Sequence, residues 1–190
     1  ALPILKRFAV ITMVLAMVFM FEGMSSAGPA PVEKTGQTTS YATGDDGQLE
    51  MGVPWPDPRF TDNGDGTVTD NLTGLIWLKN ANCFGQRRWA DALFGSNILA
   101  DGQCGLTDGS SPGDWRLPNI KELQSLIHYG VYKPVLSNTA GNGKWSEGDP
   151  FTGVADVRDY RLWSATTTPA NDRGAYQVNM RHGRTQSTLK

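Results

Sequence analysis

Hydrophobic and turn-forming positions alternate between residues 60 and 78, which is typical of short strands joined by tight turns. The segment Asn63-Gly64-Asp65-Gly66 carries residues that accept a positive φ, so it predicts a turn between a strand at Phe60 and a β-branched strand at residues 67–69. A second turn at residues 71–74 leads into a short apolar strand at residues 75–78. The region therefore predicts a hairpin followed by a third strand.

Apolar side chains recur at helical spacing in two later segments. The first begins near Arg88 and runs for about 13 residues. One face of it holds Trp89, Ala92, Leu93, Ser96 and either Leu99 or Ala100. The second begins after Asn119, which caps a helix in combination with Glu122, and Gly130 is a suitable stop. Its apolar stripe consists of Ile120, Leu123, Leu126 and Ile127.

The chain after Gly130 is rich in Gly and Pro and predicts a long loop region. Short strands are expected at residues 160–165 and 175–180, and from Arg184 onward. These elements predict an α+β fold in which two helices pack on short, twisted antiparallel sheets. The tryptophans that lie inside the apolar patterns are expected in the core; they are Trp77, Trp89, Trp115 and Trp163.

The N-terminal segment, residues 1–27, has the pattern of a secretory signal peptide. Two basic residues precede an uncharged apolar run of 14 residues at Phe8–Phe21, and Ser25-Ser26-Ala27 supplies small residues at the cleavage position. A membrane-spanning helix needs about 20 apolar residues, so contact with a membrane is expected only if this segment stays uncleaved. Residues 28–52 have the composition of a flexible tether, and the folded domain is expected over residues 53–190.

Cys83 and Cys104 are the two cysteines of the chain. An even cysteine count in an exported protein usually means pairing, and no Cys-x-x-Cys pattern indicates a reactive thiol. We therefore predict a disulfide that closes a loop with 20 residues between its ends. Such a bridge contributes about 3 kcal/mol in the chain-entropy treatment. The expected location is the bacterial periplasm, the cell surface or the medium.

Three segments carry a resemblance to a known family. They are Asp62-Asn63-Gly64-Asp65-Gly66-Thr67-Val68-Thr69-Asp70, Trp115-Arg116-Leu117-Pro118 before the second helix, and Trp163-Ser164. Their order and residue types resemble the Lcl C-terminal domain family, named for a bacterial collagen-like adhesin, over about residues 53–183. The resemblance implies a C-type-lectin-like fold. Relatives usually continue past the position of Lys190 into a final strand, so this chain is expected to lack that strand.

Patterns for catalysis or metal binding are weak. An EF-hand alignment of the loop places Thr61 and Leu72 where calcium needs its first and last oxygen ligands, so a hairpin turn is preferred and no metal or cofactor is expected. The two histidines do not have the spacing of a metal-binding pair, and His128 is interpreted as a residue at a helix C-terminus. Formylglycine-generating enzymes share a related lectin-like fold, but they depend on cysteines that the predicted disulfide would occupy. An enzyme is therefore not expected.

Charge is distributed unevenly along the chain. Residues 28–150 hold 9 basic and 15 acidic side chains, whereas residues 151–190 hold 6 basic and 3 acidic ones. Arginines that share a surface would attract sulfated or carboxylated polymers, whereas scattered arginines would pair with nearby aspartates. The adhesin that names the family is associated with anionic polysaccharides. The candidate ligand-binding residues lie on a predicted hairpin, where Met180 packs inward; they are Arg173, Tyr176, Asn179, Arg181, His182 and Arg184.

These observations predict an exported, non-catalytic binding module of the adhesin type, whose ligand is an anionic glycan or a surface protein. Nucleic acid is not expected as a partner, because the chain is exported and mildly acidic. Two alternatives stay open. One is a structural domain that assembles with a protein partner or as a homo-oligomer, and the other is a binding protein diversified by a retroelement, a role that some lectin-fold relatives play.

Overall fold

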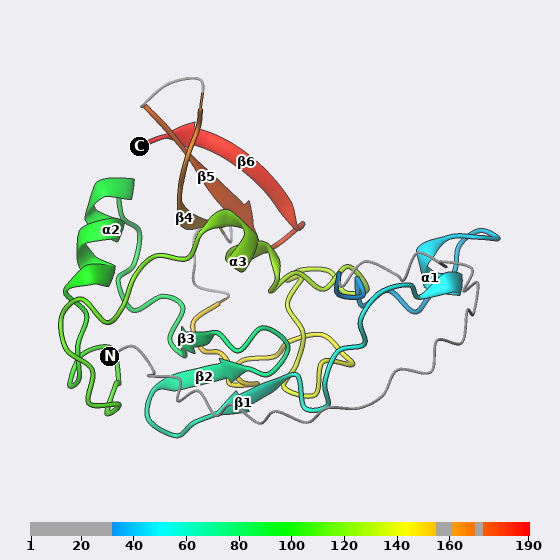
Figure 1. The fold of residues 1–190 in the computed structure, drawn as a ribbon, viewed down its shortest axis with the longest axis horizontal. Helices are drawn as coiled ribbons and strands as arrows, with labels where there is room; N and C mark the ends of the chain where they lie inside the picture. The colour runs from blue at the N-terminus through cyan, green and yellow to red at the C-terminus, as the bar shows by residue number, and fades with distance from the viewer. Residues whose placement is uncertain (1–31, 155–160, 170–172) are drawn as a thin grey trace, which may run out of the picture.

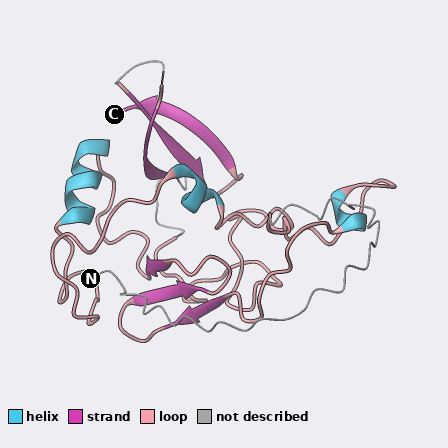
Figure 2. Ribbon diagram, in the orientation of Figure 1, coloured by secondary structure: helices cyan, strands magenta, loops and turns pink. Residues whose placement is uncertain are grey.

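The computed structural model describes residues 32–154, 161–169 and 173–190, which form a small mixed α/β protein. Two three-stranded antiparallel sheets lie above and below the short helix α3 in the view of Figures 1 and 2. The predicted signal peptide lies outside the described residues. In chain order the elements are α1 (Asp46–Leu49), β1 (Phe60–Asp62), β2 (Thr67–Asp70), β3 (Ile76–Leu78), α2 (Trp89–Asn97), α3 (Ile120–Gln124), β4 (Arg161–Thr167), β5 (Gly174–Asn179) and β6 (Arg184–Leu189).

The first sheet, in the order β1-β2-β3, forms where the sequence predicts it. In the turn between β1 and β2, the side chain of Asp62 accepts a hydrogen bond from the N–H of Gly64 at 3.1 Å. Gly66 has a φ of 87°, and a Cβ at this position would lie 2.3 Å from the carbonyl oxygen of Gly105. Glycine is therefore required here both by the backbone angle and by the close approach of a second loop.

Both predicted helices are present, but each is shorter than expected. α2 begins directly after Arg88 and ends at Asn97. α3 has the predicted capping box, in which Asn119 and Glu122 exchange side-chain and backbone hydrogen bonds. It ends at Gln124 because the N–H groups of Leu126 and Ile127 bond three residues back, to the carbonyls of Leu123 and Gln124, and the chain leaves the α-helical path. The apolar stripe continues past this point and stays buried.

The second sheet has the order β4-β5-β6, and its three strands agree with the predicted positions. Gln177 at the centre of β5 faces Trp163 on one side and Gln186 on the other. Two indole groups join this sheet to the α2 region. Trp163 donates to the carbonyl of Arg87 at 3.0 Å, and Trp89 donates to the carbonyl of Ser164 at 2.9 Å.

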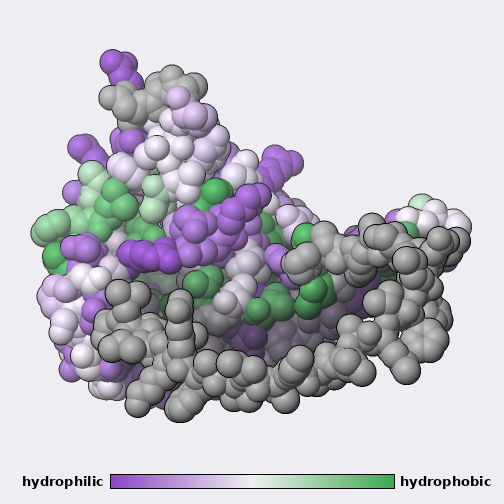
Figure 3. Space-filling view, viewed as in Figure 1, coloured by the Kyte–Doolittle hydropathy of each residue, from purple (hydrophilic) through white to green (hydrophobic). Residues whose placement is uncertain are grey.

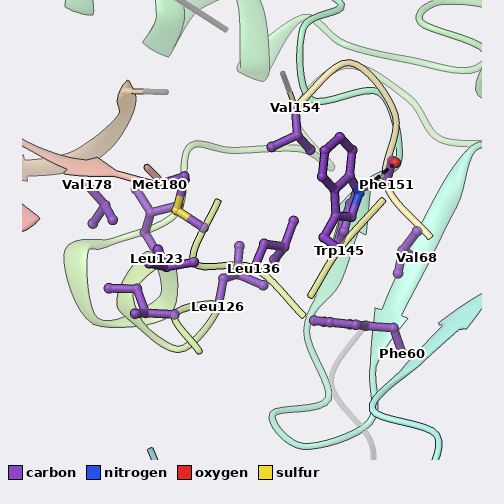
Figure 4. Close-up of a cluster of buried hydrophobic side chains, with 12 residues drawn as sticks. Phe60, Val68, Leu123, Leu126, Leu136, Trp145, Phe151, Val154, Val178 and Met180 are labelled. Atoms are coloured by element: carbon purple, nitrogen blue, oxygen red, sulfur yellow. Dashed lines mark hydrogen bonds between the residues drawn. The ribbon is translucent and has the colours of Figure 1, made fainter. Parts of the chain in front are cut away.

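The hydrophobic core lies between the two sheets, and the loop region contributes much of it (Figure 4). The loop side chains in the buried cluster are Val135, Leu136, Trp145, Phe151 and Val154. They pack with residues of β1, β2, α3 and β5, and with Met180 directly after β5, which points inward as predicted and is 1% exposed. The four tryptophans that were predicted in the core are only half-buried. The buried tryptophan is Trp145, whose indole N–H donates to the carbonyl of Phe151 at 3.0 Å.

A buried ion pair fixes the first sheet to the turn that follows α3. The Arg59 guanidinium makes two hydrogen bonds to the Asp70 carboxylate, at 2.8 and 2.9 Å, and both side chains are fully buried. Arg59 also donates to the carbonyl of Ser125 at 2.9 Å and lies 4.2 Å from the ring of Trp55. A charge in such a place is tolerated only when it is paired and hydrogen-bonded.

His128 is a buried residue beyond the end of α3, which corrects the interpretation that it sits at a helix C-terminus. It is 4% exposed, and its ring packs edge-on against Trp55 with 4.8 Å between centroids. Its Nδ1 accepts a hydrogen bond from the N–H of Gly130 at 3.0 Å. Burial, together with the charge of Arg59, holds the pKa of His128 below its ordinary value.

Part of the segment predicted as a tether has local structure. It contains α1, whose first turn is capped by Asp45, and a parallel bridge between Glu33 and Val53. The indole of Trp55 donates to the carbonyl of Lys34 at 2.8 Å, and the N–H of Tyr129 donates to the carbonyl of Thr35 at 2.9 Å. α1 itself lies away from both sheets (Figure 1).

The predicted disulfide between Cys83 and Cys104 is confirmed, with 5.5 Å between the two Cα atoms. It joins the loop before α2 to the loop after it, so the helix lies inside the closed loop. The second loop is the one that approaches Gly66 of the first sheet. The disulfide therefore fixes the surroundings of α2 and of the β1–β2 turn together.

Candidate functional site

The β5–β6 hairpin separates the six predicted ligand-binding residues into two groups. Asn179 pairs with Arg184 beside the turn, whereas Gly174 pairs with Leu189 at the opposite end. The length of β5 is about 17 Å at the usual rise per residue, so Arg173 lies far from the turn. Tyr176 is half-buried in the middle of the strand. Arg181, His182 and Arg184 remain together at the turn.

The structure adds two residues from the loop region to this turn. The N–H of Lys133 donates to the carbonyl of Arg181 at 3.3 Å, and the N–H of Val135 donates to the carbonyl of Met180 at 2.7 Å. The ring of Tyr132 lies 5.4 Å from the ring of His182, and the Lys133 ammonium lies 4.9 Å from the same tyrosine ring. We refer to the five side chains Tyr132, Lys133, Arg181, His182 and Arg184 as the basic turn cluster.

Asn179 builds the turn that presents this cluster. Its side-chain oxygen accepts a hydrogen bond from the N–H of Arg181 at 2.9 Å, and its carbonyl accepts from the N–H of Gly183 at 2.8 Å. Gly183 has a φ of 72°, which glycine adopts without strain. Met180 anchors the same turn in the core. The exposed residues on either side of these anchors are thus held on a short, hydrogen-bonded frame.

The cations of the cluster lie close enough to His182 to affect its protonation. Loss of hydration and the positive charges of Arg181, Arg184 and Lys133 together hold the pKa of the imidazole below its ordinary value. Within the described residues, none of these three cations forms an ion pair with a carboxylate. An anion that carries several negative charges would find three cations and a neutral, protonatable ring at this turn.

Tyr132 and Lys133 were not predicted at this turn, because they are about 50 positions away from it in the sequence. A local signal was nevertheless present, since Tyr129, Tyr132 and Lys133 follow one another in a short segment of the loop region. Tyr129 and Tyr132 are 59% and 54% exposed. Exposed aromatic residues beside a cation are typical of binding surfaces.

Groups of three or more His, Cys, Asp or Glu side chains that could hold a metal ion do not occur in the part of the chain that the structure describes. In that same part, no helix is long and apolar enough to cross a membrane. The loop between β1 and β2, which invites comparison with a calcium loop, uses its carboxylates in turn hydrogen bonds. Asp65, for example, accepts from both the N–H and the hydroxyl of Thr67.

A scan against family models matches the Lcl C-terminal domain over residues 66–190, a range that includes β2 and every later element. The chain belongs to the Lcl C-terminal domain family. Neither the search of curated proteins nor the search of solved structures found a match. The matched region begins inside the first hairpin and extends through β6, so all five residues of the basic turn cluster belong to the Lcl C-terminal domain.

Proposed function

We propose that this Lcl C-terminal domain is an exported, non-catalytic binding module of C-type-lectin-like fold, and that the basic turn cluster binds anionic polysaccharides. The observation that carries the proposal is that Lys133, Arg181 and Arg184 lie at one turn, joined by the Lys133–Arg181 backbone hydrogen bond and the pairing of Arg184 with Asn179, and that none of them forms an ion pair with a carboxylate in the described residues. Guanidinium groups bind sulfate and carboxylate groups through paired hydrogen bonds. The disulfide supports export, because such bonds persist in oxidising compartments.

The aromatic ring of the cluster gives the site a second kind of contact. Tyr132 is 54% exposed, and its ring lies near both the Lys133 ammonium and the His182 ring. The apolar face of a sugar ring packs well on such a side chain, whereas the cations meet its charged substituents. A polymer that offers both features, such as a sulfated polysaccharide, therefore suits the cluster better than a simple anion does.

The test is binding to heparin, measured by calorimetry at several salt concentrations with the double variant Arg181→Ala/Arg184→Ala. The double variant Arg88→Ala/Lys144→Ala is the matched control, because it removes the same charge from exposed positions outside the cluster. We expect the cluster variant to lose about tenfold or more in affinity and to show a flatter salt dependence, because exposed charge contacts are screened by salt. Lys133→Ala should act in the same direction.

Equal losses in the two double variants would contradict the proposal, because affinity would then follow net charge rather than the cluster. Absence of heparin binding by the folded protein would favour the alternative of a protein partner. The outer strands β4 and β6 of the second sheet would be the first place to look for it, since strand addition at a sheet edge is a common mode of assembly. Light scattering would then show an oligomer.

A further inference from the structure

A cavity of about 860 Å³ lies among β3, α2, α3 and the second sheet. None of the five cluster residues lines it. Its volume is within the usual range for small-molecule sites. On the face seen in Figure 3, hydrophobic surface over α2 and near the middle of the molecule is interrupted by hydrophilic side chains. The cavity is therefore a second place where this protein could hold a ligand.

The lining changes from apolar to basic as exposure increases. The buried part of the wall is built mainly of apolar side chains, namely Leu99, Leu123, Leu126, Leu136, Phe151 and Met180. The exposed lining residues include Arg87, Arg116 and Arg161. No described lining residue is Asp or Glu. An apolar interior with a basic rim is complementary to a molecule that has an apolar chain and an anionic head.

The rim arginines differ in how their charges are balanced. Arg116 makes two hydrogen bonds to the Glu122 carboxylate, at 2.8 and 2.7 Å, which balance its charge. Arg87 donates from Nε to the carbonyl of Phe84 at 2.9 Å and has no carboxylate partner within the described residues. Its two terminal amino groups donate to no acceptor among the described residues, so Arg87 is the rim residue best suited to receive an anion.

The wall also contains a buried polar group that lacks a partner. Gln177 is 7% exposed, and its Oε1 accepts no hydrogen bond within the described residues. The indole N–H of Trp77, which also lines the cavity, is a buried donor without an acceptor in the described residues, whereas the hydroxyl of Ser96 donates to the carbonyl of Leu93 at 3.0 Å. A buried acceptor without a donor is unfavourable. A hydroxyl on a bound chain would supply the missing donor.

We propose that the cavity binds anionic amphiphiles of the class of medium-chain hydroxy acids. The chain packs against the apolar wall, its hydroxyl donates to Gln177, and its carboxylate meets the guanidinium of Arg87 at the rim. Each part of the ligand thus corresponds to one observed feature of the lining. The two sites use different residues to contact their ligands, although Met180, which anchors the turn of the basic cluster, also lines the cavity.

The test is calorimetric binding of 3-hydroxydodecanoate to the full chain, below the concentration at which the acid forms micelles. Dodecanoate and 1-dodecanol are the comparison ligands, because they lack the hydroxyl and the charge respectively. We expect saturable binding of the hydroxy acid, weakened about tenfold by Arg87→Ala. Arg88→Ala is the matched control, since Arg88 is the exposed neighbour that does not line the cavity. Gln177→Met should remove the preference for the hydroxy acid over dodecanoate.

Several results would overturn the proposal. Absence of saturable binding by protein whose near-ultraviolet circular dichroism is native would do so, as would equal effects of Arg87→Ala and Arg88→Ala. Equal affinity for 1-dodecanol and for the acids would rule out recognition of the anionic head. Binding of a neutral apolar peptide in place of the acids would show that the cavity docks a polypeptide segment. The two arginine variants lie at exposed positions, so the test does not depend on the folding of the Gln177 variant.

Discussion

The first sheet holds its arginine inside the protein, whereas the turn of the second sheet holds two arginines in solvent. Arg59 is fully buried and bound to Asp70, while Arg181 and Arg184 are exposed and have no carboxylate partner in the described residues. A buried charge is destabilising unless it is paired, whereas an exposed charge is hydrated and remains available to a ligand. The same residue type therefore serves stability in one sheet and, in our proposal, recognition in the other.

The largest expected difference between the two regions is in stability. Arg59→Met would leave the Asp70 carboxylate buried without its cation, and we expect the free energy of unfolding to fall by about 3–5 kcal/mol. Arg184→Met is the matched control at the exposed turn and should change it by about 0.5 kcal/mol or less. Urea unfolding followed by tryptophan fluorescence measures both. Similar losses of stability at the two positions would show that the buried arginine and the exposed arginine do not differ in their structural role.

The local parts of both sheets could be predicted from the sequence, because turns and caps are encoded by neighbouring residues. The turn at Asn63–Gly66, the capping box of Asn119 and Glu122, and the inward direction of Met180 are examples. Each depends on backbone angles or on hydrogen bonds that span only a few positions. The disulfide also followed from composition, because only two cysteines are present.

The second expected effect concerns the disulfide, which belongs to the region of the first sheet and α2. Replacing Cys83 and Cys104 by Ser should lower the free energy of unfolding by about 3 kcal/mol, because the unfolded chain regains the freedom of the open loop. Heparin affinity of the protein that remains folded should not change, since the basic turn cluster lies in the other sheet. A parallel loss of heparin affinity would show that the two regions are coupled.

The long-range parts could not be predicted, and the two charged sites show why. The sequence pattern assigns Arg59 and Asp70 to the surface, because charged residues are usually exposed and hydrophobic periodicity does not predict a buried charge. Lys133 joins the turn of Arg181 only through backbone contacts of a loop that has no repeating pattern. The same loop supplies Trp145 to the core, so its packing was missed for the same reason. Loops without periodicity give no signal of what they contact.

The two histidines extend the comparison to pH. The pKa of buried His128 is held below its ordinary value of about 6.5. At pH values between the lowered pKa and 6.5, the unfolded chain therefore binds more protons than the folded protein. The contribution of neutral His128 to stability should therefore be fully present above about pH 6.5 and should be lost as the pH falls through the lowered pKa. Unfolding measured at pH 7.5 and 5 checks this, and His128→Gln should reduce the difference. An unchanged difference in the variant would show that other groups cause the decline.

The smallest expected effect is on binding and arises from His182. Its pKa is lowered by lost hydration and by the cations Arg181, Arg184 and Lys133, so the ring is mostly neutral near pH 7.5. A bound polyanion offsets those cations and favours the protonated ring, which means that binding takes up a proton and strengthens as the pH falls. Heparin affinity should increase about two- to fivefold between pH 7.5 and pH 5.5, because one exposed charge contact contributes about that much to binding.

His182→Gln is the variant that isolates this effect, because it removes the titrating group and keeps a polar side chain. We expect its heparin affinity to be nearly constant over the same pH range, whereas His128→Gln should retain the pH dependence of the unchanged protein. Because the carboxylates of heparin also titrate, the comparison is repeated with a fully sulfated polymer whose charge is constant in this range. A pH dependence that persists in His182→Gln would place the proton uptake elsewhere and would weaken the assignment of the ligand to the basic turn cluster.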